Sequence, residues 1–360
     1  MTFAGKGRVS LRFLCFFSAA LSRPEFSRGN ANGFTENLDK IFGVSAEADA
    51  LGFVDRPSAE TVAKLKAGQW VIGMLGSFTD ADYVAALEKA GLVGIAIEKL
   101  PRKLSSAQSM DEMTSQNSVM GYKAAITAAD AYGSFLPMMT TAAGTIRPAK
   151  ALVLGAGIAG LQAIGTLKRL GAVVTAYDVR PASQGEVESL GAKFLDLGLD
   201  FSKGQGEGGY ARALSAEEQA QQQAAVDEKA AGFDIIITTA KVPGRKPPVL
   251  LTAAGVKGLK RGAVIVDCAA SDLGGNVEGS AVGEQVTEGG VKLIGAPYLA
   301  SGVATTASNL LSRNVADILV HFVRDGKLGQ DLTEELDDAL VVAGRAAAPA
   351  AAADAEKSEK

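Results

Sequence analysis

The chain has 360 residues, a length that at roughly 150 residues per domain favours two domains, and 47% of them are hydrophobic but only 6% aromatic. Its 36 basic and 40 acidic residues give a net charge of −4, which excludes a strong general field that would attract nucleic acid or anionic lipid. Two cysteines, Cys15 and Cys268, and one histidine, His321, exclude a disulfide framework and a multi-histidine metal centre.

Residues 1–33 differ in composition from the rest of the chain. They hold five basic residues against a single acid, Glu25, around the apolar run Phe13–Leu21. A signal or transit peptide has such a composition, but the small-residue cleavage signal is weak here. We interpret this stretch as an atypical N-terminal extension that is unstructured or results from a misplaced start codon.

Short βα units are predicted between residues 34 and 139. Trp70–Leu75 and Val93–Ile97 are apolar runs of strand length, and Tyr83–Ala90 has a helical pattern. A longer helix is predicted from about Gln116 to Phe135. These elements predict a first α/β domain.

A second series of βα units follows from residue 149. Its predicted strands alternate with helical patterns, which indicates a parallel sheet. The strands are Ala151–Leu154, Val173–Tyr177, Phe233–Thr238, Ala263–Asp267 and Lys292–Ile294. The polar stretch Gly198–Ala225 predicts a mobile loop that leads into a polar helix. Thr306–Phe322 predicts an amphipathic helix, and the Ala/Pro-rich tail 345–360 is expected to be disordered.

A glycine motif stands between the first strand of this series and the helix after it. Gly155, Gly157 and Gly160 form G-x-G-x-x-G, in which the three glycines permit a tight turn, close approach of a pyrophosphate, and packing of helix on strand. The phosphates are expected on the amide groups at the start of the helix, near Ile158. The motif predicts a dinucleotide site.

An acidic residue follows the second strand of the series. Asp178 lies 18 residues beyond Gly160, where a carboxylate accepts hydrogen bonds from the adenosine ribose and repels a 2′-phosphate. The sequence therefore favours NAD over NADP, although Arg180 stands two residues later. Lys241 follows the strand that ends at Thr238 and is interpreted either as a cofactor contact or as a surface lysine.

Together the patterns predict an α/β fold of two Rossmann-like doubly wound domains, with the NAD-binding domain inserted into the other. We place the NAD-binding domain at 140–302, and the first domain at 34–139 plus 303–340. No membrane-spanning helix is expected, because the uncharged stretch 151–167 is explained by strand, turn and helix.

Several motifs in a fixed order resemble one known family. They are AQSMDEMTSQNSVMGY at 107–122, PMMTTAAGT at 137–145, GAKF at 191–194 and VATTAS at 303–308, together with the Gly155 turn. Over about residues 45–335 the chain resembles the NAD-binding α subunits of proton-translocating NAD(P) transhydrogenases, whose sister family is alanine dehydrogenase.

The resemblance implies an activity and a set of partners. It implies direct hydride transfer from NADH bound by this chain to NADP(H) bound by a partner subunit, coupled to proton movement through membrane-spanning partner subunits. It further implies a homodimer, peripheral on the cytoplasmic face of the inner membrane, with no nucleic acid partner and no metal. Direct hydride transfer needs positioning of two nicotinamide rings rather than an acid or a base.

The resemblance also implies which residues surround the nucleotide. Around the nicotinamide and its ribose it implies Gln108 and Asp111 with an arginine, as positioning groups, and the further contacts Leu104 and Thr114. Arg102 matches the arginine by its Pro-Arg context, but one extra residue before Gln108 leaves Lys103 as an alternative. The remaining implied contacts are Gly155, Ala156, Gly157, Ile158, Gly160, Asp178, Val179, Arg180, Gly209, Tyr210, Gln222 and Lys241.

Two alternative functions remain under consideration. Residues 1–40 do not resemble the start of the family's first domain, so we expect a copy that is short at its N-terminus. One alternative is therefore a truncated NAD-binding protein without turnover. The other is an alanine-type amino-acid dehydrogenase, which needs a catalytic histidine, whereas His321 is expected to be a core or boundary residue.

Overall fold

The protein is described by a computed structural model that covers residues 13–16, 48–199, 214–241, 246–287 and 289–345. The chain divides into two compact units. Unit 1 comprises residues 1–113 and 308–360, and unit 2 comprises residues 114–307. Unit 2 is thus inserted into unit 1, and both are mixed α/β structures, which confirms the predicted fold class.

The boundaries between the compact units differ from the predicted domain boundaries. The sequence placed the first division at 139/140, whereas unit 2 already includes most of α4 (Glu112–Ala131). The reason is packing, because Ala124, Ala125 and Ala128 of α4 lie in the same hydrophobic cluster as the strands of unit 2. At Gly121 a Cβ would lie only 2.1 Å from the carbonyl oxygen of Ala159, so α4 is in close backbone contact with that unit.

Unit 1 contains a five-stranded sheet in the order β1-β2-β3-β4-β16. Its parallel strands are β1 (Phe13–Phe16), β2 (Ala50–Asp55), β3 (Trp70–Met74) and β4 (Val93–Ala96), and β16 (Val341–Ala343) is antiparallel to β4. The helices and short strands around it are α2 (Ala59–Lys64), α3 (Ala81–Lys89), α9 (Ala304–His321), α10 (Glu335–Leu340), β14 (Val323–Arg324) and β15 (Lys327–Leu328).

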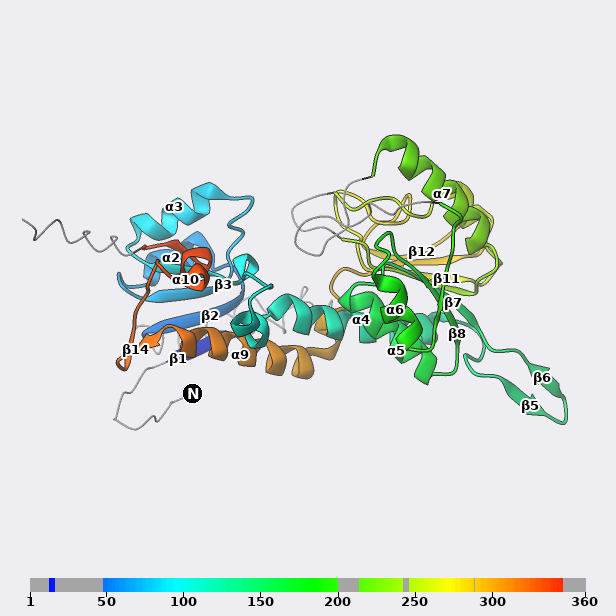
Figure 1. The fold of residues 1–360 in the computed structure, drawn as a ribbon, viewed down its shortest axis with the longest axis horizontal. Helices are drawn as coiled ribbons and strands as arrows, with labels where there is room; N and C mark the ends of the chain where they lie inside the picture. The colour runs from blue at the N-terminus through cyan, green and yellow to red at the C-terminus, as the bar shows by residue number, and fades with distance from the viewer. Residues whose placement is uncertain (1–12, 17–47, 200–213, 242–245, 288, 346–360) are drawn as a thin grey trace, which may run out of the picture. The chain divides into compact units, whose positions relative to one another are not determined.

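The two faces of this sheet are covered by different helices. Trp70 and Ile72 of β3 pack with residues of α9 and α10, whereas Val71, between them, packs with Leu87 of α3. This alternation is the side-chain period of a strand that is buried on both faces. Figure 1 shows α3 and α9 on opposite sides of the sheet.

Four residues of the N-terminal stretch belong to the sheet of unit 1. Phe13–Phe16 form β1, which pairs in parallel register with β2. The expectation of an unstructured extension therefore does not hold for these residues, because their backbone groups find partners along the edge of β2. The rest of the stretch 1–33 and the tail from residue 346 lie outside the described residues.

Unit 2 contains a seven-stranded sheet in the order β12-β13-β11-β10-β7-β8-β9. Its strands are β7 (Lys150–Leu154), β8 (Val173–Tyr177), β9 (Lys193–Phe194), β10 (Ile235–Thr238), β11 (Val264–Asp267), β12 (Gly283–Val286) and β13 (Lys292–Gly295). The five strands predicted from the sequence are confirmed within two residues at each end. The edge strand β12 was not predicted, and it is antiparallel to its neighbour.

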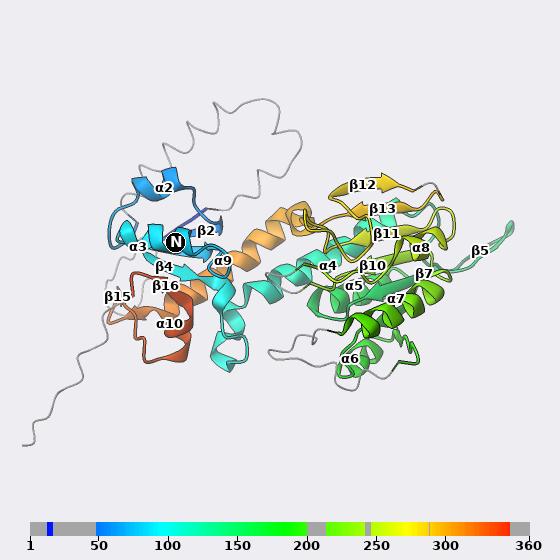
Figure 2. The same cartoon turned by 90° about the horizontal axis from the view of Figure 1, so that it is seen from above.

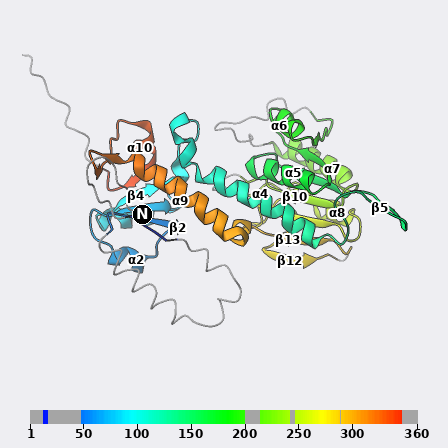
Figure 3. The ribbon, with the colours of Figure 1, turned by 90° about the horizontal axis from the view of Figure 1, so that it is seen from below.

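Helices cover both faces of this second sheet. They are α5 (Ile158–Arg169), α6 (Ser183–Ser189), α7 (Ala216–Ala230) and α8 (Ala253–Lys257), besides α4. Residues of α4, α5 and α6 pack with Val153 of β7, whereas residues of α7 and α8 pack with Leu152 and Leu154. Figure 2 shows α7 and α8 from one side, and Figure 3 shows α4 and α5 from the other.

The strand order of unit 2 creates a topological switch point. From β7 the chain runs outward to β8 and β9, and it then returns to β10 on the other side of β7. Ligands of open α/β sheets bind at such a point, beyond the carboxyl ends of the strands. A hairpin of β5 (Met139–Thr141) and β6 (Gly144–Ile146) extends away from this unit (Figure 1).

Among the described residues, no helix is both long enough and apolar enough to cross a membrane.

Candidate functional site

The glycine turn lies between β7 and α5, beside the switch point. Gly155 has φ +99°, and its amide donates to the carbonyl oxygen of Tyr177 over 2.8 Å. A Cβ at Gly155 would lie 2.8 Å from Oγ1 of Thr239, and one at Gly160 would lie 1.8 Å from the carbonyl oxygen of Gly155. These two glycines therefore allow α5 and the end of β10 to approach the turn closely.

The start of α5 is open for an anion. A Cβ at Gly157 would meet nothing within 4 Å, and no side chain caps this N-terminus. The first amides of a helix have no intrahelical acceptor and lie at the positive end of its dipole. Ile158 is partly exposed here, whereas Ala156 is buried in the core. The turn therefore has open space and free amide donors at the helix start, and the pyrophosphate site stays a prediction.

Asp178 is fixed against the glycine turn. Its Oδ2 accepts from the amide of Ala156 over 2.8 Å, and its Oδ1 accepts from both the amide and Nε of Arg180 over 2.9 Å. The guanidinium also donates to Oδ2 over 3.0 Å and to the carbonyl oxygen of Ala156 over 3.2 Å. The hydrogen bond to Asp178 raises the pKa of Arg180. Asp178 and Arg180 therefore form one charge pair, with Val179 half-buried between them.

Gln222 lies next to Tyr177, the last residue of β8. It is 2% exposed on α7, and its Nε2 donates to the hydroxyl of Tyr177 over 3.0 Å. Burial raises the pKa of Tyr177 to about 12, so its hydroxyl is neutral near pH 7. No sequence motif indicated Tyr177, although it is the residue immediately before Asp178. It connects α7 to the strand that carries the predicted ribose-binding acid.

The ends of β10 and β11 are joined by a second polar network. Asp267 is fully buried and accepts from Oγ1 of Thr238 over 2.9 Å and from the amides of Ala269 and Val277. Nδ2 of Asn276 donates to the carbonyl oxygens of Ala240 and Pro248 over 2.7 and 2.8 Å. The sequence patterns pointed to neither Asp267 nor Asn276. They fix the backbone at the edge where Lys241, which is exposed, follows β10.

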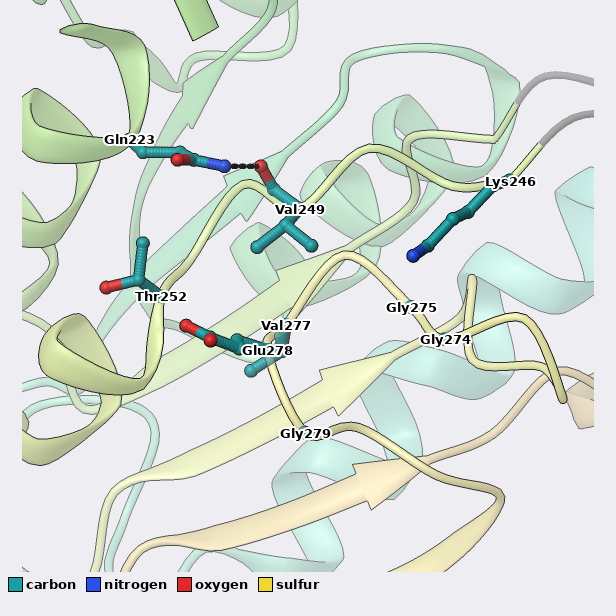
Figure 4. A pocket seen from close by; sticks show the side chains of 9 residues that line it. All are labelled: Gln223, Lys246, Val249, Thr252, Gly274, Gly275, Val277, Glu278 and Gly279. Carbon is teal, nitrogen blue, oxygen red and sulfur yellow. Dashed lines mark hydrogen bonds between the residues drawn. The ribbon is translucent and has the colours of Figure 1, made fainter. Parts of the chain in front are cut away.

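A cavity of about 390 Å³ lies beside these loops. Gln223 of α7 and Thr252 at the start of α8 line one side, and Lys246 points into the cavity (Figure 4). Nε2 of Gln223 donates to the carbonyl oxygen of Val249 over 2.8 Å. The hydroxyl of Thr252 and the carboxylate of Glu278 also have hydrogen-bond partners, with Asp227 and Ala253.

The residues implied for the nicotinamide end lie in unit 1, where Arg102 and Asp111 form an ion pair. Nε of Arg102 donates to Oδ2 of Asp111 over 2.8 Å, and its Nη1 lies 3.6 Å from Sδ of Met113. Lys103, the alternative cation, is exposed. Gln108 is exposed on the 3₁₀ helix η2 (Ser105–Met110). The structure therefore brings Arg102, and not Lys103, to Asp111.

The backbone of this segment is anchored on both sides. Ala107 and Met110 of η2 are buried, and Leu104 packs against the same hydrophobic cluster. Nδ2 of Asn314, on α9, donates to the carbonyl oxygen of Ser109 over 2.8 Å. The next residues start α4, where the carbonyl oxygen of Thr114 accepts from Oγ of Ser118 over 2.9 Å.

An acid that no sequence pattern indicated, Glu112, follows Asp111. Burial, Asp111 and Glu98 raise the pKa of Glu112 to about 7, against the effect of Arg102. Glu98, on the 3₁₀ helix η1 (Ile97–Lys99), accepts from the amide of Leu75 and from the amide and hydroxyl of Ser77.

The single histidine has structural partners. Nε2 of His321 lies 2.6 Å from Oδ1 of Asp337, which is fully buried, and Arg324 donates to both Asp337 and Glu334. His321, Glu334 and Asp337 form a group whose donor types suit a metal, but the guanidinium of Arg324 already occupies carboxylate oxygens of that group. The arrangement is a network of hydrogen bonds and ion pairs that joins His321 of α9 and Arg324 of β14 to Asp337 of α10.

The predicted site residues thus lie in three places: around η2, around the switch point of unit 2, and outside the described residues. Arg102, Lys103, Leu104, Gln108 and Asp111 lie in or next to η2 in unit 1, and Thr114 lies on α4, at the first residue of unit 2. The glycine turn, Asp178 with its neighbours, Gln222 and Lys241 surround the switch point in unit 2. Gly209 and Tyr210 lie outside the described residues.

Known proteins resemble the chain over most of its length. The model for the alanine dehydrogenase/PNT C-terminal domain matches residues 124–347, and the model for the N-terminal domain matches residues 39–120. An NAD(P) transhydrogenase subunit alpha chain of Rickettsia prowazekii is 44% identical over 268 residues, which are 74% of this chain and 69% of that protein.

A solved transhydrogenase structure from Sinorhizobium meliloti has 41% sequence identity and a TM-score of 0.72, and it covers 84% of this chain and 81% of its own. Alanine dehydrogenase of Mycolicibacterium smegmatis is 27% identical over 266 residues, which are 73% of this chain and 64% of that protein.

Proposed function

The chain belongs to the alanine dehydrogenase/PNT family, and from that premise we propose that it is the NAD(H)-binding α subunit of a proton-translocating NAD(P) transhydrogenase. The observation that carries NAD(H) binding is the fixed carboxylate of Asp178 on the amide of Ala156, beside an uncapped helix start. The greater identity to transhydrogenase α subunits than to alanine dehydrogenase favours the transhydrogenase activity.

The residues of unit 2 support binding of the adenosine and pyrophosphate parts of NAD(H). The amides at the start of α5 would hold the pyrophosphate, because they lack intrahelical acceptors. Asp178 would accept hydrogen bonds from the adenosine ribose, and its charge disfavours a 2′-phosphate. Arg180 is engaged by Asp178, so it does not offset that preference. We propose residues 140–302 as the NAD-binding domain.

The residues of unit 1 support binding of the nicotinamide end. Arg102 and Asp111 would orient the ring and its ribose together with Gln108. When bound, NADH supplies a hydride that reduces NADP⁺ on a partner subunit, so that NAD⁺ and NADPH form without a proton donor or acceptor. This chain's residues would therefore position the ring, in keeping with an ion pair that is already formed.

The partners follow from the same proposal. NADP(H) and the proton pathway would belong to other subunits, and the chain would be peripheral on the cytoplasmic face of the inner membrane. A homodimer is supported by the β5–β6 hairpin, at whose base Met138 and Ile146 are 66% and 42% exposed. Apolar side chains on an extended arm favour burial against another chain.

The proposal is tested by reconstitution. The purified chain is mixed with a transhydrogenase NADP-binding component, NADH, catalytic NADP and the acetylpyridine analogue of NAD. Reduction of the analogue that needs both proteins would establish the function. Parallel reactions with alanine and NAD test the dehydrogenase alternative, and activity there would overturn the proposal. NADH binding without turnover in either reaction would instead identify a binding protein.

The surroundings of the single histidine weigh against the alanine-type alternative. Such an enzyme needs a histidine near its substrate, and the single histidine, His321, is held by Asp337 beside Arg324. The imidazole of His321 is thus engaged in the contact between the end of α9 and α10.

A further inference from the structure

The 3₁₀ helix η2, which precedes the proposed nicotinamide contact Asp111, packs against α9. Ala107 and Met110 of η2 are buried in the same hydrophobic cluster as Leu311 and Val315 of α9. Both segments belong to unit 1, although unit 2 separates them in sequence. A 3₁₀ helix has poorer hydrogen-bond geometry than an α-helix, so the position of η2 depends on the elements that surround it.

A buried polar side chain lies on the face of α9 that packs against η2. The buried residues of this face follow the spacing of a helix turned towards a core, at Leu311, Asn314, Val315 and Ile318. An apolar residue is expected at such a position, because an amide taken out of water costs free energy unless it is hydrogen-bonded. Nδ2 of Asn314 donates to the carbonyl oxygen of Ser109, in η2, over 2.8 Å. The amide of Asn314 therefore makes a specific bond to η2.

This bond holds the chain between two residues that are proposed to orient the nicotinamide ring. Ser109 directly follows Gln108 and lies two residues before Asp111. The amide of Asp111 donates to the carbonyl oxygen of Gln108 over 3.3 Å, a long bond that closes this turn. The carboxylate of Asp111 is in turn paired with Arg102. Asn314 thus fixes the backbone between the exposed side chain of Gln108 and the ion pair of Asp111.

Resting on the proposed function, we propose that Asn314 is a positioning residue for hydride transfer. It holds the carbonyl oxygen of Ser109, and through the backbone it sets the places of Gln108 and Asp111 relative to each other. A displacement of about 1 Å at reacting groups costs about 100-fold in rate. Asn314 therefore acts on the nicotinamide end, whereas unit 2 binds the adenosine and pyrophosphate parts without its help.

The first test removes the hydrogen-bond donor in two ways. Asn314→Leu replaces the amide by an apolar side chain with the same branching, and Asn314→Asp keeps the shape but has no donor when it is ionised. In the reconstituted reaction with saturating NADH, hydride transfer should be about 10- to 100-fold slower in both variants. NADH deuterated at the transferred position should show a larger isotope effect than in the unmodified protein, because the hydride step has become slower. If Asn314→Leu does not fold, Asn314→Asp provides the measurement.

Binding measurements separate positioning of the ring from binding of the rest of the nucleotide. ADP-ribose lacks the nicotinamide ring, so both variants should bind it with the affinity of the unmodified protein. The ratio of the NADH to the ADP-ribose dissociation constant should rise by about 2- to 10-fold, the contribution of one hydrogen bond. Calorimetry measures ADP-ribose binding, and fluorescence measures NADH binding.

Gln330→Leu is the matched control for a general loss of stability. Nε2 of Gln330 donates to the carbonyl oxygen of Gly344 over 2.8 Å, so this variant removes a bond of the same kind in the same unit. It should lower the free energy of unfolding in urea, as Asn314→Leu does. It should leave the isotope effect and the ratio of dissociation constants unchanged.

Three outcomes would contradict these expectations. Hydride transfer at the unmodified rate in a folded Asn314 variant would overturn the inference and leave the proposed function intact. Equal changes in Gln330→Leu and Asn314→Leu would also overturn it, because Asn314 would then serve stability alone. An unmodified chain that transfers no hydride to NADP⁺ on a partner component would overturn the proposed function, and the inference with it.

Discussion

Asp178 has two partners in this structure, the backbone of the glycine turn and the side chain of Arg180. Its two oxygens accept four hydrogen bonds from Ala156 and Arg180. These bonds orient the carboxylate and fill its acceptor positions, so a ribose hydroxyl that binds Asp178 has to displace a hydrogen bond from Arg180. The same pairing explains how an arginine can stand beside the acid without favouring a 2′-phosphate.

Replacing Asp178 should change both affinity and selectivity. In Asp178→Asn the charged acceptor is lost, and hydrogen bonds to charged groups contribute about 1.5–3 kcal/mol, so NADH should bind about 10- to 100-fold more weakly. NADPH should bind relatively better, because the repulsive charge is gone and Arg180 is released. Fluorescence titration with both nucleotides measures the two effects. Asp196→Asn, at an exposed site in the same unit, is the control, and equal effects of the two variants would contradict the assignment.

Arg102 and Lys103 are neighbours in sequence with different surroundings. Arg102 is paired with Asp111, whereas Lys103 is exposed. Arg102→Gln should therefore raise the KM for NADH by about tenfold or more in the reconstituted reaction, since a charge-assisted contact is removed. Lys103→Gln should leave this KM nearly unchanged. A larger effect of Lys103→Gln than of Arg102→Gln would assign the arginine position to residue 103.

At the scale of elements, the turn between β7 and α5 gives its glycines different tasks. Gly160 allows the first turn of α5 to approach the carbonyl oxygen of Gly155, whereas Gly157 borders open space. One glycine therefore serves packing and the other leaves room for a ligand. The motif alone does not distinguish these two functions, because both positions hold the same residue type.

Alanine at these two positions should separate folding from binding. Gly160→Ala places a Cβ 1.8 Å from a backbone oxygen, and overpacking of this kind lowers the free energy of unfolding by about 1–3 kcal/mol. Gly157→Ala meets no atom within 4 Å and should keep the stability of the unmodified protein while it weakens NADH binding. Urea unfolding and NADH titration of both variants provide the measurements. Full NADH affinity in Gly157→Ala would argue against close approach of the pyrophosphate.

Much of the second sheet could be predicted, because its strands are continuous apolar runs. β7, β10 and β11 are buried along most of their length, and the pattern is local. β12 escaped prediction because its side chains are mostly exposed and carry no apolar period. β16 escaped it because Val341–Ala343 pairs with β4, which lies far earlier in the chain, and no local pattern encodes that pairing.

The residues of the candidate site could likewise be predicted only where a local sequence pattern marks them. The glycine turn and Asp178 follow from spacing, since the strand before each residue fixes its place. Asp267 and Asn276 carry no motif, and their roles follow only from the adjacency of β10 and β11. In sequence, Glu112 is an acid at a helix start; its raised pKa comes first from burial, then from Asp111 and from Glu98, and the burial is set by the fold.

At the scale of the whole molecule, the insertion of unit 2 into unit 1 gives each unit a core of its own. The sheet of unit 1 takes its edge strand β16 from the far end of the chain, next to the ion pairs of His321, Arg324 and Asp337. Unit 1 is thus complete only when the chain after unit 2 returns to it. The hairpin β5–β6 belongs to neither core and is available to another chain.

The homodimer should depend on the exposed apolar side chains at the base of this hairpin. Met138→Asp places a charge where we expect an apolar contact with a second copy, and burial of an unpaired charge is costly. The unmodified protein should therefore sediment as a dimer, and Met138→Asp should dissociate at concentrations at which the unmodified protein does not. Val320→Asp is the matched control, because Val320 is 55% exposed on α9 in unit 1. If both variants stay dimeric, or if the unmodified protein is a monomer, the hairpin is not a dimer contact, and its apolar residues would have to serve the membrane-spanning or NADP-binding partners instead.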